Sequence, residues 1–192
     1  MWWQQQAAFT KHNLTRNPFG ALTLHERGSL AVIEPIEIAP FKPVQIIADA
    51  GHGKTTHLLA LRAQHPKSLY EYVNDPSLKT GTRGLFLVDE AQRLSAAELK
   101  RLFRTQALLV LGTHADLTEH SPHPLRTIRI ASLSLEKLQA VVNARISAAR
   151  RDSAEPVPML TDIQLRGLMQ RHGSNLRAIE ASLYEAFQHG DL

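Results

Sequence analysis

One short segment constrains this chain more than any other: a glycine-containing loop that joins an apolar strand pattern to a helix pattern. Residues 44–48, Val-Gln-Ile-Ile-Ala, are typical of a buried strand, and a helix is predicted over residues 55–64. The loop between them matches G-x-x-x-x-G-K-S/T at every position except the first, where Ala48 replaces glycine. The segment therefore predicts a strand–loop–helix unit that holds a phosphate group.

The chemistry of the loop explains its residue types. Glycines at positions 51 and 53 supply the backbone freedom that lets N–H groups point at phosphate oxygens, and the helix N-terminus adds partial positive charge. Lys54 is expected to contact the β- and γ-phosphates, and Thr55 to ligate Mg²⁺. The residues assigned to nucleotide contact are Ala50, Gly51, His52, Gly53, Lys54, Thr55 and Thr56.

A second apolar run ends in two carboxylates. Residues 85–88, Leu-Phe-Leu-Val, predict a buried strand of a parallel sheet, and Asp89 and Glu90 follow it directly. Acids at the carboxyl end of such a strand face the ligand crevice of the sheet. We expect Asp89 to bind Mg²⁺ and the nucleotide with it, and Glu90 to polarise an attacking water molecule.

Strand and helix patterns alternate along the middle of the chain. Strands are also predicted over 68–73, 107–111 and 127–130, and a helix over 95–104 opens with a capping box at Ser95 and Glu98. Beyond residue 132 only helices are predicted, over 134–151, 161–172 and 175–188. We therefore expect an α/β fold, a parallel sheet flanked by helices, in residues 44–132, followed by a small helical lid in 133–192. Residues 1–43 are expected to be an irregular lead-in with at most a short strand at 30–33.

Composition narrows the chemistry further. The chain has 192 residues and no cysteine, which excludes disulfides, thiolate metal sites and a cysteine nucleophile. The longest apolar runs are too short to span a bilayer, and the N-terminal residues lack a signal-peptide pattern, so a soluble cytoplasmic protein without a membrane partner is expected. The net charge of +4 permits contact with a polyanion without requiring it. Trp2 and Trp3 are expected either to pack on the chain itself or to contact a partner.

These motifs together resemble the AAA+ ATPases over residues 44–189. The phosphate loop, the strand that ends Asp89-Glu90-Ala91-Gln92, and the trailing helices carry the resemblance. Residues 88–94 are most similar to bacterial transposition-regulator and secretion-associated ATPases. Residues 173–180, Gly-Ser-Asn-Leu-Arg-Ala-Ile-Glu, resemble the last lid helix of replication initiators and clamp loaders.

The resemblance assigns roles to further residues. It implies that Thr113, with His114 as second choice, senses the γ-phosphate, and that Arg126 completes the site of a neighbouring subunit in a homo-oligomer. Arg177 corresponds to the lid arginine that contacts the γ-phosphate, and Phe19 to a neighbour of the adenine. The competing interpretation of Thr113 is a polar residue that ends a strand. For Arg126 and Arg177 it is an exposed surface arginine.

The resemblance implies that ATP and Mg²⁺ are the cofactors, and that ATP is hydrolysed by an oligomeric switch that regulates a DNA transaction such as target selection, loading or transposition. The expected partners are DNA and a further protein. One alternative is a nucleotide-binding adaptor that does not hydrolyse ATP, and a small-molecule kinase ranks last. The short separation of Lys54 from Asp89, 35 positions, and the loop expected at 74–84 are departures from the family.

Overall fold

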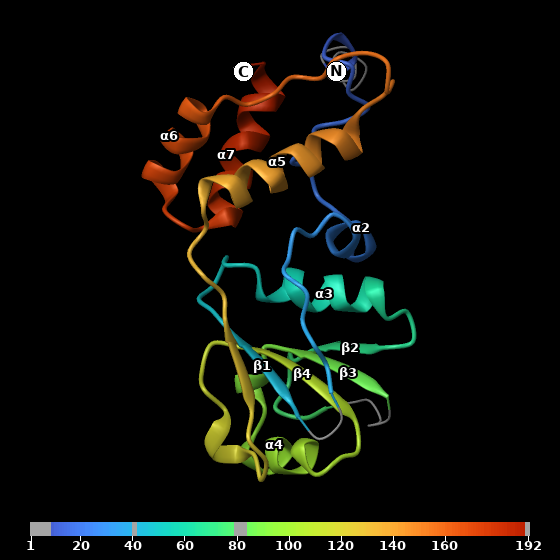
Figure 1. Cartoon of the computed structure of the whole chain (residues 1–192), viewed down its shortest axis with the longest axis vertical. Helices are drawn as coiled ribbons and strands as arrows, with labels where there is room; N and C mark the ends of the chain where they lie inside the picture. The colour runs from blue at the N-terminus through green and yellow to red at the C-terminus, as the bar shows by residue number, and fades with distance from the viewer. Residues whose placement is uncertain (1–8, 40–41, 79–83, 191–192) are drawn as a thin grey trace. The chain divides into compact units, whose positions relative to one another are not determined.

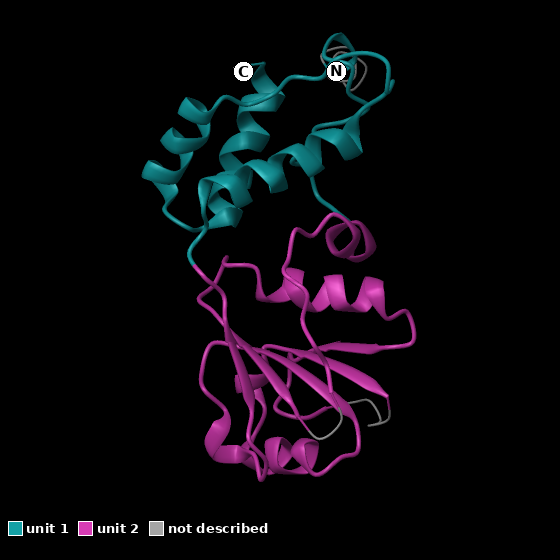
Figure 2. Ribbon diagram, in the orientation of Figure 1, with its two compact units in different colours: residues 1–23, 132–192 teal, residues 24–131 magenta. Residues whose placement is uncertain are grey.

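The computed structural model describes residues 9–39, 42–78 and 84–190. Trp2 and Trp3 lie outside these residues. The chain divides into two compact units (Figure 2). Unit 1 combines residues 1–23 with 132–192, and unit 2 comprises residues 24–131. The lead-in expected over 1–43 is thus shared between the two units.

Unit 2 is built on a parallel sheet of five strands (Figure 1). The strands are β1 (Val44–Ile47), β2 (Leu69–Tyr72), β3 (Leu85–Asp89), β4 (Leu108–Thr113) and β5 (Arg126–Arg129). They lie in the order β2-β3-β4-β1-β5, and every pair of neighbours is parallel. The predicted α/β fold with a parallel sheet is confirmed. The strand that leads into the glycine loop and the strand that ends in the two acids are therefore not neighbours, because β4 lies between them.

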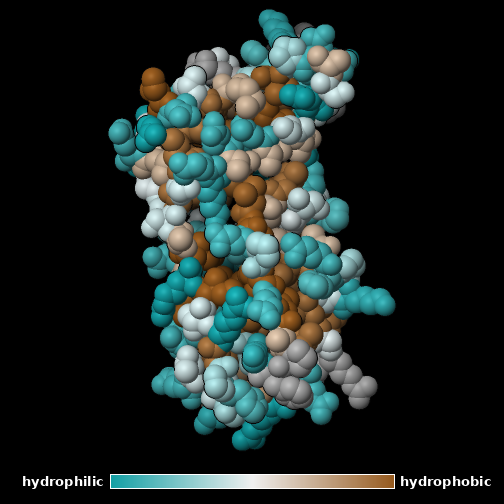
Figure 3. All heavy atoms as spheres, viewed as in Figure 1, coloured by the Kyte–Doolittle hydropathy of each residue, from teal (hydrophilic) through white to brown (hydrophobic). Residues whose placement is uncertain are grey.

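The sheet is covered on both faces, by α3 (Lys54–Gln64) and by α4 (Ala96–Phe103) (Figure 1). Alternate residues of β3 serve the two faces: Phe86 and Val88 pack in the cluster that includes the apolar side of α4, whereas Leu85 and Leu87 pack in the cluster that includes α3. This explains the uninterrupted apolar run of the strand. Figure 3 shows mainly hydrophilic residues over the end of unit 2 that carries α4. Lys100 and Arg101 of α4 are exposed, and so is its C-cap residue Arg104.

A short helix precedes the sheet. α2 (Leu24–Ser29) packs on α3, so this part of the lead-in is helical, and residues 30–33, where at most a short strand was expected, form none. A six-residue helix has little stability by itself, and the sequence pattern does not reveal it. Its contact with α3 depends on Gly28, because a Cβ at that position meets the carbonyl oxygen of Leu59 at 2.4 Å.

Two short 3₁₀ turns follow the strands that carry the candidate site. η1 (Ala91–Arg93) follows β3, and η2 (Thr118–His120) follows β4. Ser95 caps α4 by accepting a hydrogen bond from the Glu98 N–H, but the Glu98 side chain does not complete a capping box. Its carboxylate instead accepts hydrogen bonds from Arg101 and from the backbone of Leu78.

Unit 1 is a helical bundle of α5 (Leu135–Ala149), α6 (Asp162–His172) and α7 (Leu176–His189). Thr161 and Gln164 form a capping box at the start of α6, and Gly173 is its C-cap. The segment 9–23 completes the core of this unit, where the ring of Phe19 lies 5.2 Å from that of Phe187. The Asn17 side chain donates to the carbonyl oxygen of Tyr184 and ties the segment to α7.

Candidate functional site

The loop between β1 and α3 has the backbone geometry of an anion cradle. Gly51 and Gly53 have φ of 82° and 93°, in the left-handed region that side chains other than glycine rarely adopt. The N-cap residue of α3 is Gly53, which has no side chain to cap the helix, and the N–H groups of the first turn point toward the loop. An anion bound there meets both these donors and the positive end of the helix.

A histidine on α3 anchors this loop. His57 is 8% exposed, and both its ring nitrogen Nδ1 and its backbone N–H approach the carbonyl oxygen of Gly53, at 2.8 and 3.0 Å. At the tip, the Nδ1 atom of His52 lies 3.0 Å from the carbonyl oxygen of Ala50. The sequence pattern did not single out His57, because a buried histidine inside a helix has no motif of its own.

Lys54 is the first residue of α3 and is only 5% exposed. Its ammonium group donates to the carbonyl oxygens of Ala48 and Asp49, at 2.8 and 3.1 Å. It also lies 3.1 Å from Nε2 of His114. The lysine is thus held over the loop in the position from which it can reach a bound phosphate, while its hydrogen bonds are made within the protein.

The strand order explains the presence of a histidine at this place. β4 lies between β1 and β3, so the residues that follow β4 emerge between the glycine loop and the two acids. The imidazole of His114 contacts both sides, since its Nε2 atom also lies 3.4 Å from the Glu90 carboxylate. The first-choice sensor, Thr113, is buried, and its hydroxyl exchanges hydrogen bonds with the backbone of Ala115. The side chain that the fold brings to Lys54 and Glu90 is therefore that of His114.

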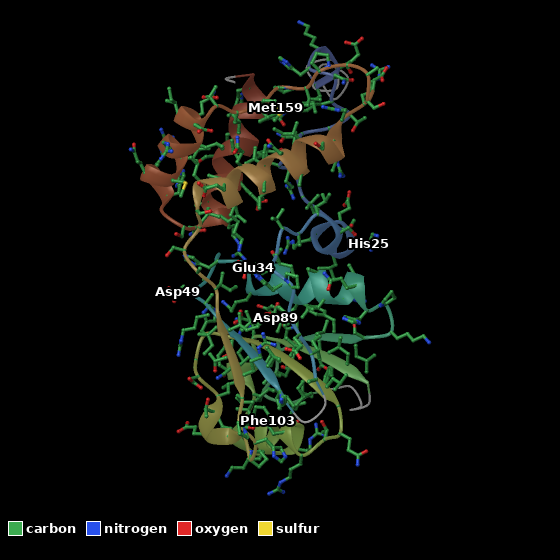
Figure 4. All side chains as sticks on the ribbon, viewed as in Figure 1. His25, Glu34, Asp49, Asp89, Phe103 and Met159 are labelled. Carbon is green, nitrogen blue, oxygen red and sulfur yellow. The ribbon has the colours of Figure 1, made fainter. Side chains whose placement is uncertain are left out.

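Asp89 is fully buried at the end of β3, below α3 (Figure 4). One carboxylate oxygen accepts the Glu90 N–H at 3.0 Å, and the other accepts the hydroxyl of Tyr70 on β2 at 3.0 Å. Burial, together with the Asp89 carboxylate, raises the pKa of Tyr70, so this hydroxyl stays protonated and donates. Gly112 on β4 permits the close approach, because a Cβ there meets Asp89 Oδ1 at 2.9 Å.

Glu90 has an unusual backbone conformation. Its φ is 59°, and only one other described non-glycine residue, Asn13, has a positive φ. Its side chain is 13% exposed, and its carboxylate lies 3.4 Å from both Nε of Arg93 and Nε2 of His114. The amide of Gln92 donates to the same carboxylate at 2.8 Å. Such backbone strain, of about 1–3 kcal/mol, persists where surrounding contacts hold it, and it is common at functional sites.

A buried amide supports the segment that carries His114. Gln45 in the middle of β1 is 0% exposed, accepts the N–H of Leu117 at 2.9 Å and donates to Asp116 at 2.9 Å. Hydrogen bonds from Thr118 and then from Gln45 lower the pKa of Asp116 to about 2. These bonds fasten the loop after β4 onto the strand that leads into the phosphate loop.

Of the remaining predicted residues, Arg126 lies in unit 2 but away from this cluster, whereas Arg177 and Phe19 belong to unit 1. Arg126 begins β5 and pairs in register with Val44, at the amino end of the sheet, whereas the phosphate loop follows the carboxyl end of β1. Its guanidinium donates to the carbonyl oxygen of Glu37 at 2.9 Å. In unit 1, Arg177 is exposed on the first turn of α7, and Phe19 is 6% exposed in the helical core.

The cluster brings together an ammonium group, an imidazole and two carboxylates, those of Lys54, His114, Asp89 and Glu90. Among the described ranges, no three His, Asp or Glu side chains gather as a metal site. Within the same ranges, no helix has the length and apolar character that crossing a membrane requires. Two hard oxygen donors of the kind that Mg²⁺ prefers are present in the neighbouring elements. The Thr55 hydroxyl belongs to the first turn of α3, and the Asp89 carboxylate lies at the end of β3.

Comparison with known proteins gives a structural likeness only. No family model matches the sequence, and no curated protein matches it. The structure is similar to a single-substitution variant of Thermotoga maritima RuvB, with a TM-score of 0.52 and 13% identity. That match covers 74% of this chain and 53% of the RuvB chain, so this chain spans about half the length of RuvB.

A second similar structure is domain III of the Thermotoga maritima replication initiation protein DnaA. The TM-score is 0.51 at 13% identity, over 78% of this chain and 76% of the DnaA domain. Identity at this level supports a statement about fold alone. The chain has the fold of the P-loop AAA+ domains, with a parallel five-stranded sheet and helices C-terminal to it.

Proposed function

We propose that unit 2 binds ATP together with Mg²⁺ and hydrolyses it to ADP. The glycines of the loop, the N-terminus of α3 and the ammonium of Lys54 form the cradle for the phosphates. Ala50 and His52 of the loop and Thr56 of α3 add backbone or side-chain contacts to the phosphates. When the nucleotide binds, Lys54 exchanges its bond to His114 for one to phosphate oxygens.

The donor set fits Mg²⁺. The Thr55 hydroxyl and the Asp89 carboxylate are the hard oxygen ligands this ion prefers, and each oxygen of Asp89 has a second lone pair beyond the hydrogen bond it accepts. Held by Thr55 and Asp89, Mg²⁺ would supply positive charge that neutralises phosphate oxygens. Tyr70 and the Glu90 N–H orient the Asp89 carboxylate for this purpose.

One observation carries the hydrolytic part of the proposal: Glu90 and Lys54 meet at the same imidazole, that of His114. The carboxylate that is suited to polarise water therefore lies beside the cation that is suited to bind the γ-phosphate. A carboxylate in this position acts as a general base toward water. Because His114 contacts both Lys54 and Glu90, we propose that it responds to the γ-phosphate, with Thr113 supporting its loop.

The output of such a site is a change of assembly. Arg126 lies at the other end of the sheet from its own phosphate loop, so we propose that it serves the site of a neighbouring copy in a homo-oligomer. We propose that Arg177 contacts the γ-phosphate from the helical lid. A cation in the first turn of a helix is destabilised by the helix dipole, and a bound anion offsets this cost. Phe19 is proposed as a neighbour of the adenine from unit 1.

We propose a DNA transaction as the process that this switch regulates, with DNA and a further protein as partners. The fold likeness to a domain of a replication initiation protein supports this choice, as does the motif likeness of residues 88–94 to transposition regulators. The location that fits these partners is the cytoplasm. One fold can host many functions, so the test of turnover includes DNA.

An adaptor that binds ATP without hydrolysing it is the second candidate. One observation favours it: the side chains proposed for catalysis already have partners within the protein. Lys54, Glu90 and Asp89 all make hydrogen bonds or ion pairs there. In that case these hydrogen bonds and ion pairs stabilise the nucleotide-free fold, and nucleotide binding rearranges them without hydrolysis. The proposed lid and neighbour contacts apply equally to this candidate.

The test is phosphate release from Mg²⁺-ATP by the pure chain, with and without double-stranded DNA. Glu90→Gln is expected to lower turnover by about 100-fold or more, because it removes a general base, while ATP binding is retained. Glu119→Gln, a matched change on an exposed loop, is expected to behave as the unaltered chain. Stimulation by DNA supports the DNA role. ATP binding with no turnover above that of Glu90→Gln contradicts hydrolysis and favours the adaptor.

A further inference from the structure

Gln92 bridges two parts of the candidate site that come from different strands. Its side chain lies in η1, directly after the acidic strand. The amide nitrogen donates to the Glu90 carboxylate at 2.8 Å, and the amide oxygen accepts the backbone N–H of His114 at 3.2 Å. One planar group thus ties the end of β3 to the residue that follows β4.

The chemistry of this position calls for an amide. One arm must donate to a carboxylate and the other must accept from a backbone N–H, and a single glutamine side chain supplies both. The donor arm is charge-assisted, so it is the stronger of the two. A carboxylate at position 92 repels Glu90, and an apolar side chain makes neither bond.

Glu90 depends on such support because its backbone lies in the left-handed region, outside any helix or strand. Its ion-pair partner Arg93 has a side chain that is 47% exposed, and Nε of Arg93 lies 3.4 Å from the Glu90 carboxylate. Exposed ion pairs of this kind hold geometry weakly, at about 0–1 kcal/mol. The bond from Gln92 is shorter and comes from a less exposed side chain.

We propose that Gln92 is a positioning residue that clamps the Glu90 carboxylate beside His114, and with it beside Lys54. This inference rests on the proposed hydrolysis of ATP and adds a residue to it. The clamp fixes the direction of the carboxylate without touching the nucleotide. Its loss therefore lowers the rate of turnover and leaves nucleotide affinity intact.

The kinetic test compares Gln92→Met with the unaltered chain in Mg²⁺-ATP. Methionine keeps the length and volume of the side chain and removes both hydrogen bonds. The expected result is a kcat lower by about 10–100-fold, the range typical of outer-shell partners, with KM changed less than about twofold. Gln64→Met, an exposed glutamine at the end of α3, is the matched control and keeps the original kcat. A Gln92→Met kcat equal to that of the control overturns the proposal.

A second measurement tests the clamp without hydrolysis. In the nucleotide-free chain the amide proton of His114 is expected to shift upfield in Gln92→Met, because it loses its acceptor. Gln92→Glu keeps an acceptor at this place but repels the Glu90 carboxylate, so it is expected to preserve that amide shift and still to lower kcat. An unchanged His114 amide in Gln92→Met, or a normal kcat in Gln92→Glu, contradicts the clamp.

These readouts separate the two failures. If the unaltered chain shows no turnover, the proposed hydrolysis fails, whereas the His114 amide still reports whether the bridge exists. If the unaltered chain turns over and only the Gln92 variants behave normally, the positioning role fails alone.

Discussion

The ammonium nitrogen of Lys54 lies 3.1 Å from Nε2 of His114, although the two residues are 60 positions apart in the chain. The contact exists because β1, which precedes the lysine, and β4, which precedes the histidine, are neighbours in the sheet. A phosphate that binds the loop competes directly with this imidazole for the lysine. Loss of the contact between Lys54 and His114 would therefore report that a phosphate has bound the loop.

The first prediction concerns that contact. Saturating ATP in EDTA, where hydrolysis is suppressed, is expected to shift the imidazole resonances of His114, because Lys54 leaves the ring for the phosphates. The measurement is a nitrogen-edited spectrum of histidine-labelled protein. His123, which is exposed in the loop before β5, is the internal control and keeps its resonances. Unchanged His114 signals at saturating nucleotide contradict the placement of Lys54 on the phosphates.

The second prediction concerns the hydrogen bond between Tyr70 and Asp89. Tyr70→Phe removes the donor and leaves a fully buried carboxylate oxygen without that partner. Hydrogen bonds to charged groups contribute about 1.5–3 kcal/mol, so the free energy of unfolding is expected to fall by that order. Urea denaturation at neutral pH measures the change.

Tyr72→Phe on the same strand is the control for this substitution. Tyr72 is 42% exposed, and an exposed change of this size alters stability by less than about 0.5 kcal/mol. Equal stability of the two variants means that the Tyr70 hydroxyl does not stabilise Asp89.

The third prediction concerns the contact between α2 and α3. In Gly28→Ala the added methyl group meets the carbonyl oxygen of Leu59 at 2.4 Å, which requires α2 to move. Overpacking of this kind destabilises by about 1–3 kcal/mol. Gly167→Ala in α6 meets no atom within 4 Å and improves helix propensity, so it is expected to stabilise by up to about 1 kcal/mol. Thermal unfolding of both variants gives the comparison, and a shift of the same sign in the two argues against the close contact.

The fourth prediction concerns acid pH. The pKa of Asp116 is about 2 in the folded chain, below its ordinary value of 3.8, because Thr118 and Gln45 donate to it. The unfolded chain therefore takes up the proton first as the pH falls. The stabilisation is present above about pH 4 and is lost between about pH 4 and 2.

Asp116→Asn removes this titration. Chemical denaturation at several pH values between 5 and 2 is expected to show a flatter dependence of unfolding free energy on pH for this variant. Glu119→Gln on the same loop controls for the change of charge. An identical pH dependence of Asp116→Asn and the unaltered chain contradicts the role of the Gln45 network.

The fifth prediction tests whether Arg126 acts on a neighbouring copy. Lys54→Ala and Arg126→Ala are each expected to lose turnover, and a mixture of the two is expected to recover part of it. Recovery follows because a phosphate loop from one variant meets the arginine of the other. Arg129→Ala, which changes a 68% exposed arginine on the same strand, keeps its turnover. A mixture with no more activity than its components rejects a shared site.

Local features of the fold follow directly from the residues. The apolar runs, the capping box of Thr161 and Gln164, and the glycines at 51 and 53 act through bonds that reach only a few positions along the chain. The parallel sheet flanked by helices was predicted on these grounds and is confirmed. Helix α2 was missed, because it is stabilised by packing on α3 through Gly28 and not by its own sequence.

The tertiary structure decided which of these residues meet. Only the strand order places β4 between the phosphate loop and the acids, and so selects the side chain of His114 over that of Thr113 for contact with Lys54 and Glu90. The same order brings Tyr70 to Asp89 and Gln92 to His114. By itself the sequence determined the elements and the chemistry of the loop, because those depend on neighbours in the chain. The contacts between strands depend on how buried faces pack together, and only the folded sheet determines that.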